Sequence, residues 1–259
     1  MAYFEDVEGL IELRNILEID VYYDSDNQYH NIYPNLDCYI DWGDGQAEYA
    51  RGGHRWENAG INHTYKLKEP ASYTVKITGR VTGLNSENIP APCVAEVVQW
   101  GMTGLNDLNS AFENNYLLKK VADDTYGSFS QVGCVDEMFM RCTELEYIPE
   151  GLFNNCQNIY YLNSTFANCN SLKEIPARLF ADLRDLEYLS NTFRGCHGLT
   201  SIPADLFIFN SKIASVQAVY LPKTLGIVAE DGAYIKFTMA NGMKGSVKVA
   251  FSEPRGGLV

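Results

Sequence analysis

The most regular feature of the chain is a set of apolar residues that recurs every 27 positions between about residues 108 and 215. Each copy opens on a phenylalanine, and a leucine, a branched aliphatic residue and a second aromatic residue follow at fixed offsets. The columns are Phe112, Phe139, Phe166 and Phe193; Leu118, Leu145, Leu172 and Leu199; Val121, Ile148, Ile175 and Ile202; and Tyr126, Phe153, Phe180 and Phe207. Four copies in one register, without an insertion, indicate a repeat architecture.

Within each copy the apolar residues stand three positions apart, as in Phe166, Cys169, Leu172 and Ile175. This spacing fits neither the alternation of a long strand nor the 3.6-residue period of a long helix. It suits a coil that turns a corner every few residues and points one side chain inward at each corner. Coils stacked at the inter-strand distance of about 4.8 Å would align equivalent side chains in columns. The pattern therefore predicts a solenoid.

Proline follows the branched aliphatic position in three copies, at Pro149, Pro176 and Pro203. Because proline cannot donate to a strand ladder, it should end a short strand in each copy. The expected strands lie near Leu145–Ile148, Leu172–Ile175 and Leu199–Ile202. The pattern leaves open whether Ile159–Leu162 and Leu186–Leu189 form a second row of strands.

Short helical turns are expected between these strands. Proline is favoured as the first residue of a helix, which predicts a helical segment over Pro176–Leu183. A column of small polar residues lies three positions before each phenylalanine and has the composition of helix N-caps, for turns such as Ser164–Cys169. Its members are Asn109, Asp136, Asn163 and Ser190.

The two ends of the chain are predicted to be β-structured. Alternating strand signals divided by turn residues predict an antiparallel β-sandwich over residues 1–90. Its expected strands are Leu17–Tyr23, Leu36–Trp42, Ala47–Arg51 and Tyr73–Val81. The solenoid then spans residues 91–215. Over residues 216–259, Tyr234–Met239 and Ser246–Phe251 flank Asn241-Gly242, a strong hairpin signal, and form either a β cap or a docking element.

The repeated motif x-F-x-x-C-x-x-L-x-x-I-P resembles the leucine-rich repeats of the BspA-like family of bacterial surface proteins, from about residue 95 to 215. The resemblance implies a leucine-rich-repeat solenoid in an extracellular or surface-displayed protein that binds other proteins or host surfaces. The family offers no catalytic residues that could be carried over. The first residues, MAYFEDVEGLIELRN, show no signal-peptide pattern. Either a leader has been removed, or the protein reaches its destination without one, which would suit assembly inside a cell.

Three stretches of the first hundred residues resemble a PKD domain, an immunoglobulin-like sandwich. They are Tyr39–Gly45 with the sequence YIDWGDG, then His63-Thr64-Tyr65, then Ser72–Ile77. The resemblance covers about residues 10–82 and implies a spacer or binding module without an active site. Asp41 and Asp44 could form an acid/base pair, but both belong to the turn motif. We therefore expect structural roles for these carboxylates and for His63.

Charge and cysteine content narrow the functional classes. A formal net charge of −13 argues against nucleic acid, whose binding depends on Lys and Arg neutralising phosphates. No apolar run reaches the roughly 18–20 residues of a transmembrane segment. The chain has seven cysteines; those of the repeat column, Cys142, Cys169 and Cys196, are expected to be buried free thiols that behave as small hydrophobic residues.

No enzyme, cofactor or metal is expected. The chain contains no nucleophile elbow, P-loop or HExxH motif. Asp24, Asp26 and Asn27 lack the spacing and the glutamate of an EF-hand, which favours a solvated loop over a calcium site.

The main hypothesis is a non-enzymatic, surface-displayed binding or adhesion protein that recognises a protein or a glycan through the repeat face. Tyrosine at exposed repeat positions favours an interface because it offers a large contact area at low entropic cost. The candidate ligand-binding residues are Tyr147, Tyr160, Tyr161, Tyr188, Lys173 and Glu174. The first alternative is a structural subunit of a bacteriophage particle, such as a fibre, decoration or tail component, assembled through the C-terminal segment and located in the virion. The second is an accessory domain of a polysaccharide-active system.

Overall fold

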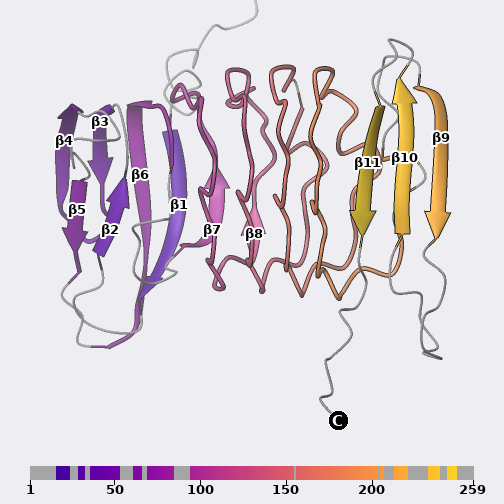
Figure 1. Cartoon of the computed structure of the whole chain (residues 1–259). Helices are drawn as coiled ribbons and strands as arrows, with labels where there is room; N and C mark the ends of the chain where they lie inside the picture. The colour runs from indigo at the N-terminus through magenta and orange to yellow at the C-terminus, as the bar shows by residue number, and fades with distance from the viewer. Residues whose placement is uncertain are drawn as a thin grey trace, which may run out of the picture.

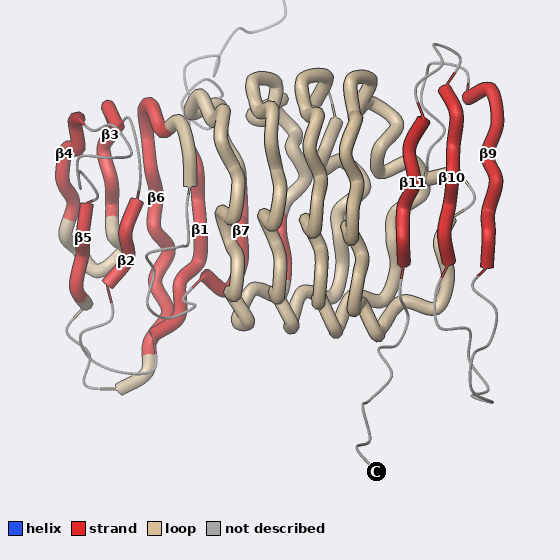
Figure 2. Tube along the Cα trace, viewed as in Figure 1, coloured by secondary structure: helices blue, strands red, loops and turns tan. Residues whose placement is uncertain are grey.

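The computed structural model describes residues 16–23, 29–32, 36–52, 61–65, 69–84, 94–154, 156–203, 205–206, 213–220, 233–239 and 244–249. Throughout these ranges the chain forms strands, turns and loops, with no helix (Figure 2). The fold is therefore β-rich, as predicted. No helix that could cross a membrane occurs in the same ranges.

A six-stranded mixed sheet forms the N-terminal part of the molecule, in the order β4-β3-β6-β1-β7-β8 (Figure 1). All neighbours are antiparallel except β7 and β8, which run parallel. The four strands expected here are confirmed. The strands of this sheet are β1 (Ile16–Tyr23), β3 (Leu36–Asp41), β4 (Ala47–Gly52), β6 (Ala71–Val81), β7 (Val94–Gln99) and β8 (Lys120–Val121).

Beside this sheet lies a two-stranded ribbon of β2 (Tyr29–Ile32) and β5 (Ile61–Thr64). The six-stranded sheet crosses the domain boundary expected near residue 90, because β7 pairs with β1 on one side and with β8, in the repeat region, on the other. The sheet thus continues directly into the repeats. Asp24, Asp26 and Asn27 lie outside the described residues.

The Gly-Asp-Gly turn after β3 depends on glycine. Gly43 and Gly45 have φ angles of 76° and 87°, and a Cβ on Gly43 would lie 2.5 Å from the carbonyl oxygen of Thr74. The turn is closed by carboxylates: Asp41 Oδ1 accepts the N–H of Gly43 at 2.9 Å. Only glycine combines this backbone geometry with such close packing.

The ribbon is joined to this turn through one histidine. His63 Nε2 lies 2.9 Å from Asp44 Oδ2, and its ring stacks on Trp42 with centroids 4.6 Å apart. Tyr65 donates its hydroxyl to the carbonyl oxygen of Trp42 at 2.8 Å. Asp44 also accepts the N–H of Gln46 at 3.0 Å. Asp44 and His63 are therefore used to hold the turn, in agreement with their expected structural roles.

The repeats form stacked coils in which the backbone N–H groups alternate in direction. In one coil, Ser164, Phe166 and Asn168 donate to the carbonyl oxygens of residues 190, 192 and 194 in the next coil, at 2.8, 2.9 and 2.6 Å. Between them, Ala167 and Cys169 donate three residues back within their own coil, at 2.9 and 3.3 Å. The neighbouring coils repeat this alternation.

The predicted helical turns at Ser164–Cys169 and Pro176–Leu183 are wrong, because both segments are non-helical turns. An α-helix directs every interior N–H to its own carbonyl four residues back. In Ser164–Cys169 three of these groups bond to another coil, and in Pro176–Leu183 the N–H groups of Leu179, Ala181 and Leu183 bond three residues back. The alternation requires a left-handed backbone at repeated positions. Residues with positive φ recur every 27 positions, as Ser110, Glu137, Ser164 and Asn191, and as Asn114, Arg141, Asn168 and Gly195.

The column of small polar residues links coils and does not cap helices, which corrects the N-cap prediction. Asp136 Oδ1 accepts the N–H of Asn163 in the next coil at 2.6 Å, and Asn163 Oδ1 accepts that of Ser190 at 2.9 Å. The side chains of Asp136 and Asn163 each satisfy a donor one repeat further along.

The strands expected at Leu145–Ile148, Leu172–Ile175 and Leu199–Ile202 are not formed; the described strand of this row is β8 in the first copy. One cross-coil bond, from Lys173 N–H to Glu146 O at 3.1 Å, remains in the row. The prolines that follow these segments, Pro149, Pro176 and Pro203, have no backbone N–H to donate, so they cannot extend the row of strands. The second row, left open by the sequence, contains isolated parallel bridges that join Cys134, Tyr161 and Tyr188.

Stacked phenylalanine rings run along the inside of the coils. Phe112, Phe139, Phe166 and Phe193 are buried, with successive centroids 5.7, 5.4 and 5.4 Å apart and nearly parallel planes. They belong to one hydrophobic core that extends from Leu17 in β1 to Leu206. The phenylalanine, leucine and branched aliphatic columns predicted from the period are therefore observed in the described copies. In the fourth column Phe153 and Phe180 are buried, Tyr126 is half-buried and Phe207 lies outside the described residues.

The repeat cysteines are buried and unpaired, as predicted. They also donate hydrogen bonds, which a purely hydrophobic role did not anticipate. The thiols of Cys142, Cys169 and Cys196 point to the carbonyl oxygens of residues 112, 139 and 166 in the preceding coil, at 3.2, 3.1 and 3.0 Å. Burial raises the pKa of Cys196 to about 12, so the thiol stays protonated as a donor.

A three-stranded antiparallel sheet in the order β11-β10-β9 follows the last coil (Figure 1). It comprises β9 (Ile213–Tyr220), β10 (Ala233–Met239) and β11 (Lys244–Val249). The predicted pairing of the last two strands is confirmed, although β11 ends before Phe251. The first strand, β9, was not predicted.

Replacing Phe166 with alanine removes the ring that stacks between Phe139 and Phe193. We expect a loss of about 3–5 kcal/mol in the free energy of unfolding, since a buried aromatic side chain leaves a cavity. Urea unfolding followed by circular dichroism measures it. Tyr116→Ala, at an exposed position, is the control and should change stability by less than about 0.5 kcal/mol. A loss below about 1 kcal/mol for Phe166→Ala would contradict the stacked core.

The Asp44 turn should make stability depend on pH. Burial opposes ionisation of Asp44, but the N–H of Gln46 and the contact with His63 lower its pKa on balance. A carboxylate with a lowered pKa stabilises the fold above the unfolded value of about 3.9 and loses this contribution as pH falls through the folded value. Asp44→Asn should therefore cost about 1 kcal/mol near pH 6, and progressively less below about pH 4.

The measurement is urea unfolding of both proteins between pH 3 and 6. Asp185→Asn, at an exposed turn position, serves as the matched control and should show no such trend. A constant difference between wild type and Asp44→Asn over this range would exclude the proposed role of the carboxylate.

Candidate binding surface

The predicted ligand-binding residues lie on two surface rows of the stacked coils. The 147 row consists of residues 119–120, 146–147, 173–174 and 200–201. The 161 row consists of residues 106–107, 133–134, 160–161 and 187–188. In both rows the flanking apolar residues point inward: Leu145 and Ile148 beside the first, Ile159 and Leu162 beside the second. The rows are half of a 27-residue coil apart, so they lie on different sides of the stack.

In the 147 row the charged and aromatic groups contact one another. The Lys173 ammonium forms an ion pair with Glu146 and lies 5.0 Å from the centre of the Tyr147 ring. Its Nζ is also 3.4 Å from the Tyr147 hydroxyl. Glu146 and then Tyr147 raise the pKa of Lys173. The polar groups of Glu146, Tyr147 and Lys173 are thus satisfied by one another.

In the 161 row the tyrosines form a ladder. The rings of Tyr161 and Tyr188 stack with centroids 4.9 Å apart and an interplanar angle of 11°. Tyr160 lies beside them, 6.5 Å from Tyr161. The exposed fractions of Tyr160, Tyr161 and Tyr188 are 37%, 41% and 48%. The backbone bridge between Tyr161 and Tyr188 fixes the ladder spacing.

All six predicted residues therefore lie at the surface, but in two clusters. Tyr160, Tyr161 and Tyr188 come together in the 161 row, and Tyr147 contacts Lys173 in the other. Glu174 is exposed beside Lys173 and makes no hydrogen bond or ion pair within the described part of the chain.

A further tyrosine pair on the N-terminal sheet was not predicted. Tyr39 in β3 and Tyr49 in β4 are directly opposite each other, with 50% and 62% of their surface exposed. The Tyr49 hydroxyl donates to Asp37, and this contact raises the pKa of Tyr49. The sequence signal for this tyrosine pair is the alternation Asp37-x-Tyr39 in one strand and Tyr49-x-Arg51 in the next, since alternate residues of paired strands share a face.

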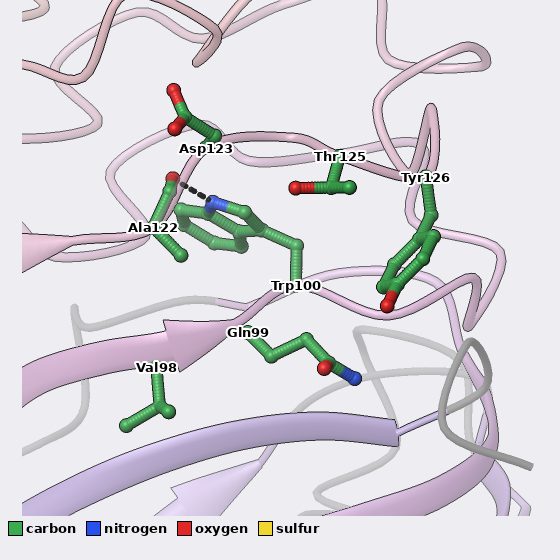
Figure 3. A pocket seen from close by; sticks show the side chains of 7 residues that line it. All are labelled: Val98, Gln99, Trp100, Ala122, Asp123, Thr125 and Tyr126. Carbon is green, nitrogen blue, oxygen red and sulfur yellow. Dashed lines mark hydrogen bonds between the residues drawn. The ribbon is translucent and has the colours of Figure 1, made fainter. Parts of the chain in front are cut away.

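A small pocket lies where β7 meets the first coil (Figure 3). Its volume is about 100 Å³, well below the roughly 300 Å³ of small-molecule sites. The Trp100 indole on its floor donates to Ala122 O at 2.8 Å. The Asp123 carboxylate points away from this ring in Figure 3 and accepts the N–H of Gly151 at 2.6 Å. The Trp100 indole and the Asp123 carboxylate of this pocket thus both bind backbone groups of the coils.

The titratable groups of the 161 row include one partly accessible thiol. Cys134 is half-buried, its Sγ lies 3.9 Å from Asn109 Oδ1, and burial raises its pKa. Within the described ranges, no three His, Cys, Asp or Glu residues are grouped as metal ligands would be.

Stacking in the tyrosine ladder should contribute measurably to stability. A double-mutant cycle with Tyr161→Ala and Tyr188→Ala should give a coupling energy of about 0.5–1 kcal/mol, as for stacked cross-strand aromatic pairs. Urea unfolding of the four proteins provides the measurement. A parallel cycle with Tyr147→Ala and Tyr188→Ala, which lie on different rows, should be additive within about 0.3 kcal/mol. Equal coupling in both cycles would contradict a specific ring contact.

Comparison of the chain with protein-family models, with curated proteins and with solved structures gives no match.

Proposed function

We propose that this chain is a non-enzymatic binding protein displayed on an extracellular or cell surface, and that it recognises a protein or a glycan through the 161 row. The stacked coils would then be a leucine-rich-repeat solenoid of the kind suggested by the repeated motif, with the N-terminal sheet as part of an immunoglobulin-like domain. The observation that supports the proposal most directly is the exposed ladder of Tyr161 and Tyr188.

Three large side chains at the surface of one row are not required by the core. The inward corners on either side, Ile159 and Leu162, already fill the interior. Exposed tyrosines give contact area with two rotatable bonds and a hydroxyl for hydrogen bonding, so their immobilisation costs little entropy. The stacked geometry restrains Tyr161 and Tyr188 before any partner arrives, which lowers that cost further.

The 161 row is favoured over the 147 row because of charge pairing. A partner at the 147 row would have to compete with the ion pair between Lys173 and Glu146 and with the cation–π contact to Tyr147. Desolvating paired charges at an interface costs free energy unless new partners replace them. The tyrosines of the 161 row offer apolar faces without that penalty.

A second candidate function is a structural subunit of a larger particle, with a bacteriophage fibre, decoration or tail component as the specific form. It is favoured by the C-terminal sheet, where β9 and β11 pair only with β10 among the described strands. Sheet edges are templates for pairing with another chain. This function would place the recognition element in residues 213–249 instead of the 161 row.

The test separates the two rows. The intact protein is screened on immobilised glycans and in pull-downs from candidate surface extracts, together with Tyr161→Ala/Tyr188→Ala and with Tyr147→Ala/Lys173→Ala. We expect the first double variant to weaken binding at least ten-fold, because it removes both rings of the ladder, whereas the second changes it less than two-fold. Equal binding by wild type and Tyr161→Ala/Tyr188→Ala would exclude the proposed face, and incorporation of both variants into purified particles would favour the structural role.

A further inference from the structure

The tyrosine ladder ends abruptly in the direction of the N-terminus. The repeat column that contains Tyr188 and Tyr161 continues to Cys134 and then to Asp107. The adjoining column contains Tyr160 and then Gly133. A bulky side chain is therefore replaced at both positions by a short one within a single coil.

One face of the Tyr161 ring is covered by Tyr188, 4.9 Å away. The opposite face is directed towards the coil of Cys134, because the bridges place Cys134 and Tyr188 on either side of Tyr161. Gly133 adds no side chain there, and a Cβ built on it would find its nearest neighbour, the carbonyl oxygen of Asn158, at 3.6 Å. We call the surface position of Gly133 and Cys134, next to the face of Tyr161 that Tyr188 does not cover, the notch.

The far side of the notch is polar. Asn106, which is exposed, and Asp107, which is half-buried, occupy the equivalent positions one coil earlier. Asp107 Oδ1 holds the N–H of Asn109 at 3.1 Å, so its carboxylate has a defined orientation. The notch thus has the Tyr161 ring on one side and, one coil beyond Cys134, amide and carboxylate groups on the other.

We infer that the notch binds one neutral pyranose ring of a glycan, which stacks on the free face of Tyr161 as the next rung of the ladder. The inference rests on the proposed binding function and names its ligand class. A pyranose presents C–H groups on one face, which suit an aromatic ring, and hydroxyl groups at its edge, which suit Asn106 and Asp107. It is also about as thick as one rung.

Two other ligand classes fit less well. An aromatic side chain of a protein could stack on Tyr161, but its ring edge would offer no hydrogen bonds to the polar wall, and burying such groups without partners is costly. An acidic sugar would meet Asp107 in a chain with a net charge of −13, and like charges disfavour it. The charge pattern therefore selects a neutral sugar.

The experiment introduces a tyrosine at the position where the tyrosine ladder ends. Cys134→Tyr places a third ring beside Tyr161 and should close the notch, while Cys134→Ser keeps it open. Thr200→Tyr adds an exposed tyrosine to the 147 row and is the matched control. On a panel of immobilised neutral oligosaccharides, we expect Cys134→Tyr to lose at least ten-fold in binding, with Cys134→Ser and Thr200→Tyr within two-fold of wild type. Circular dichroism and thermal unfolding establish that each variant is folded.

A second measurement needs no substitution. Iodoacetamide alkylation of Cys134 in the intact wild-type protein, located by peptide mass spectrometry, should slow at least three-fold when the best-binding oligosaccharide of the panel is present at saturation. An acidic analogue of the same oligosaccharide, at equal concentration, should give weaker protection.

The outcomes distinguish this inference from the proposed function. Glycan binding that survives Cys134→Tyr, or that leaves the alkylation rate of Cys134 unchanged, overturns the notch. Absence of glycan binding together with capture of a protein through Tyr161 and Tyr188 also overturns it, but leaves the binding function standing. Absence of any partner sensitive to Tyr161→Ala/Tyr188→Ala removes both.

Discussion

The alternating direction of the backbone N–H groups is the constraint on which the coils depend. Groups such as the N–H of Phe166 bond to the next coil, and the intervening ones, such as that of Ala167, bond within their own coil. This arrangement satisfies buried donors without a helix and with few strands, as buried backbone groups require. It also sets the distance between coils, so that equivalent side chains meet at a separation that suits ring stacking. The phenylalanine centroids at about 5.4 Å follow from the backbone ladder.

The same spacing acts on the outside of the coil. Tyr161 and Tyr188 are stacked because their backbones are bridged at neighbouring rungs, just as Phe166 and Phe193 are stacked inside. A residue exchanged on the surface at one rung therefore changes the shape of the row without disturbing the core. Where Cys134 stands in place of a tyrosine, a smaller side chain occupies the position beside Tyr161, while the buried column of phenylalanines continues unchanged.

Much of the fold was predictable from the sequence because a fixed period requires fixed columns, which is why Phe112 and its equivalents were correctly placed inside. The period does not reveal where a backbone N–H points, so the polar residue Asn163, which has the composition of an N-cap, wrongly predicted a helical turn at Ser164–Cys169. Asp136 shows the same limit, since a capping side chain can satisfy a donor of its own coil or of the next, and composition does not distinguish them. The surface positions of Tyr147, Tyr160, Tyr161 and Tyr188 were predictable because they lie between inward-pointing residues, whereas Tyr39 and Tyr49 form a pair only through the strand register.

A stack of coils must also be closed at its ends, since the last ring of an internal column would otherwise be exposed. Trp100 closes the N-terminal end: its ring packs edge-on against Phe112 and Phe129, with centroids 6.0 and 4.7 Å away. The residue directly follows β7, which belongs to the N-terminal sheet and pairs in parallel with β8 of the first coil. The sheet therefore serves as the starting template for the coils as well as their cap. For this reason the N-terminal strands and the repeats behave as one structural unit, and the core passes from β1 into the coils without interruption.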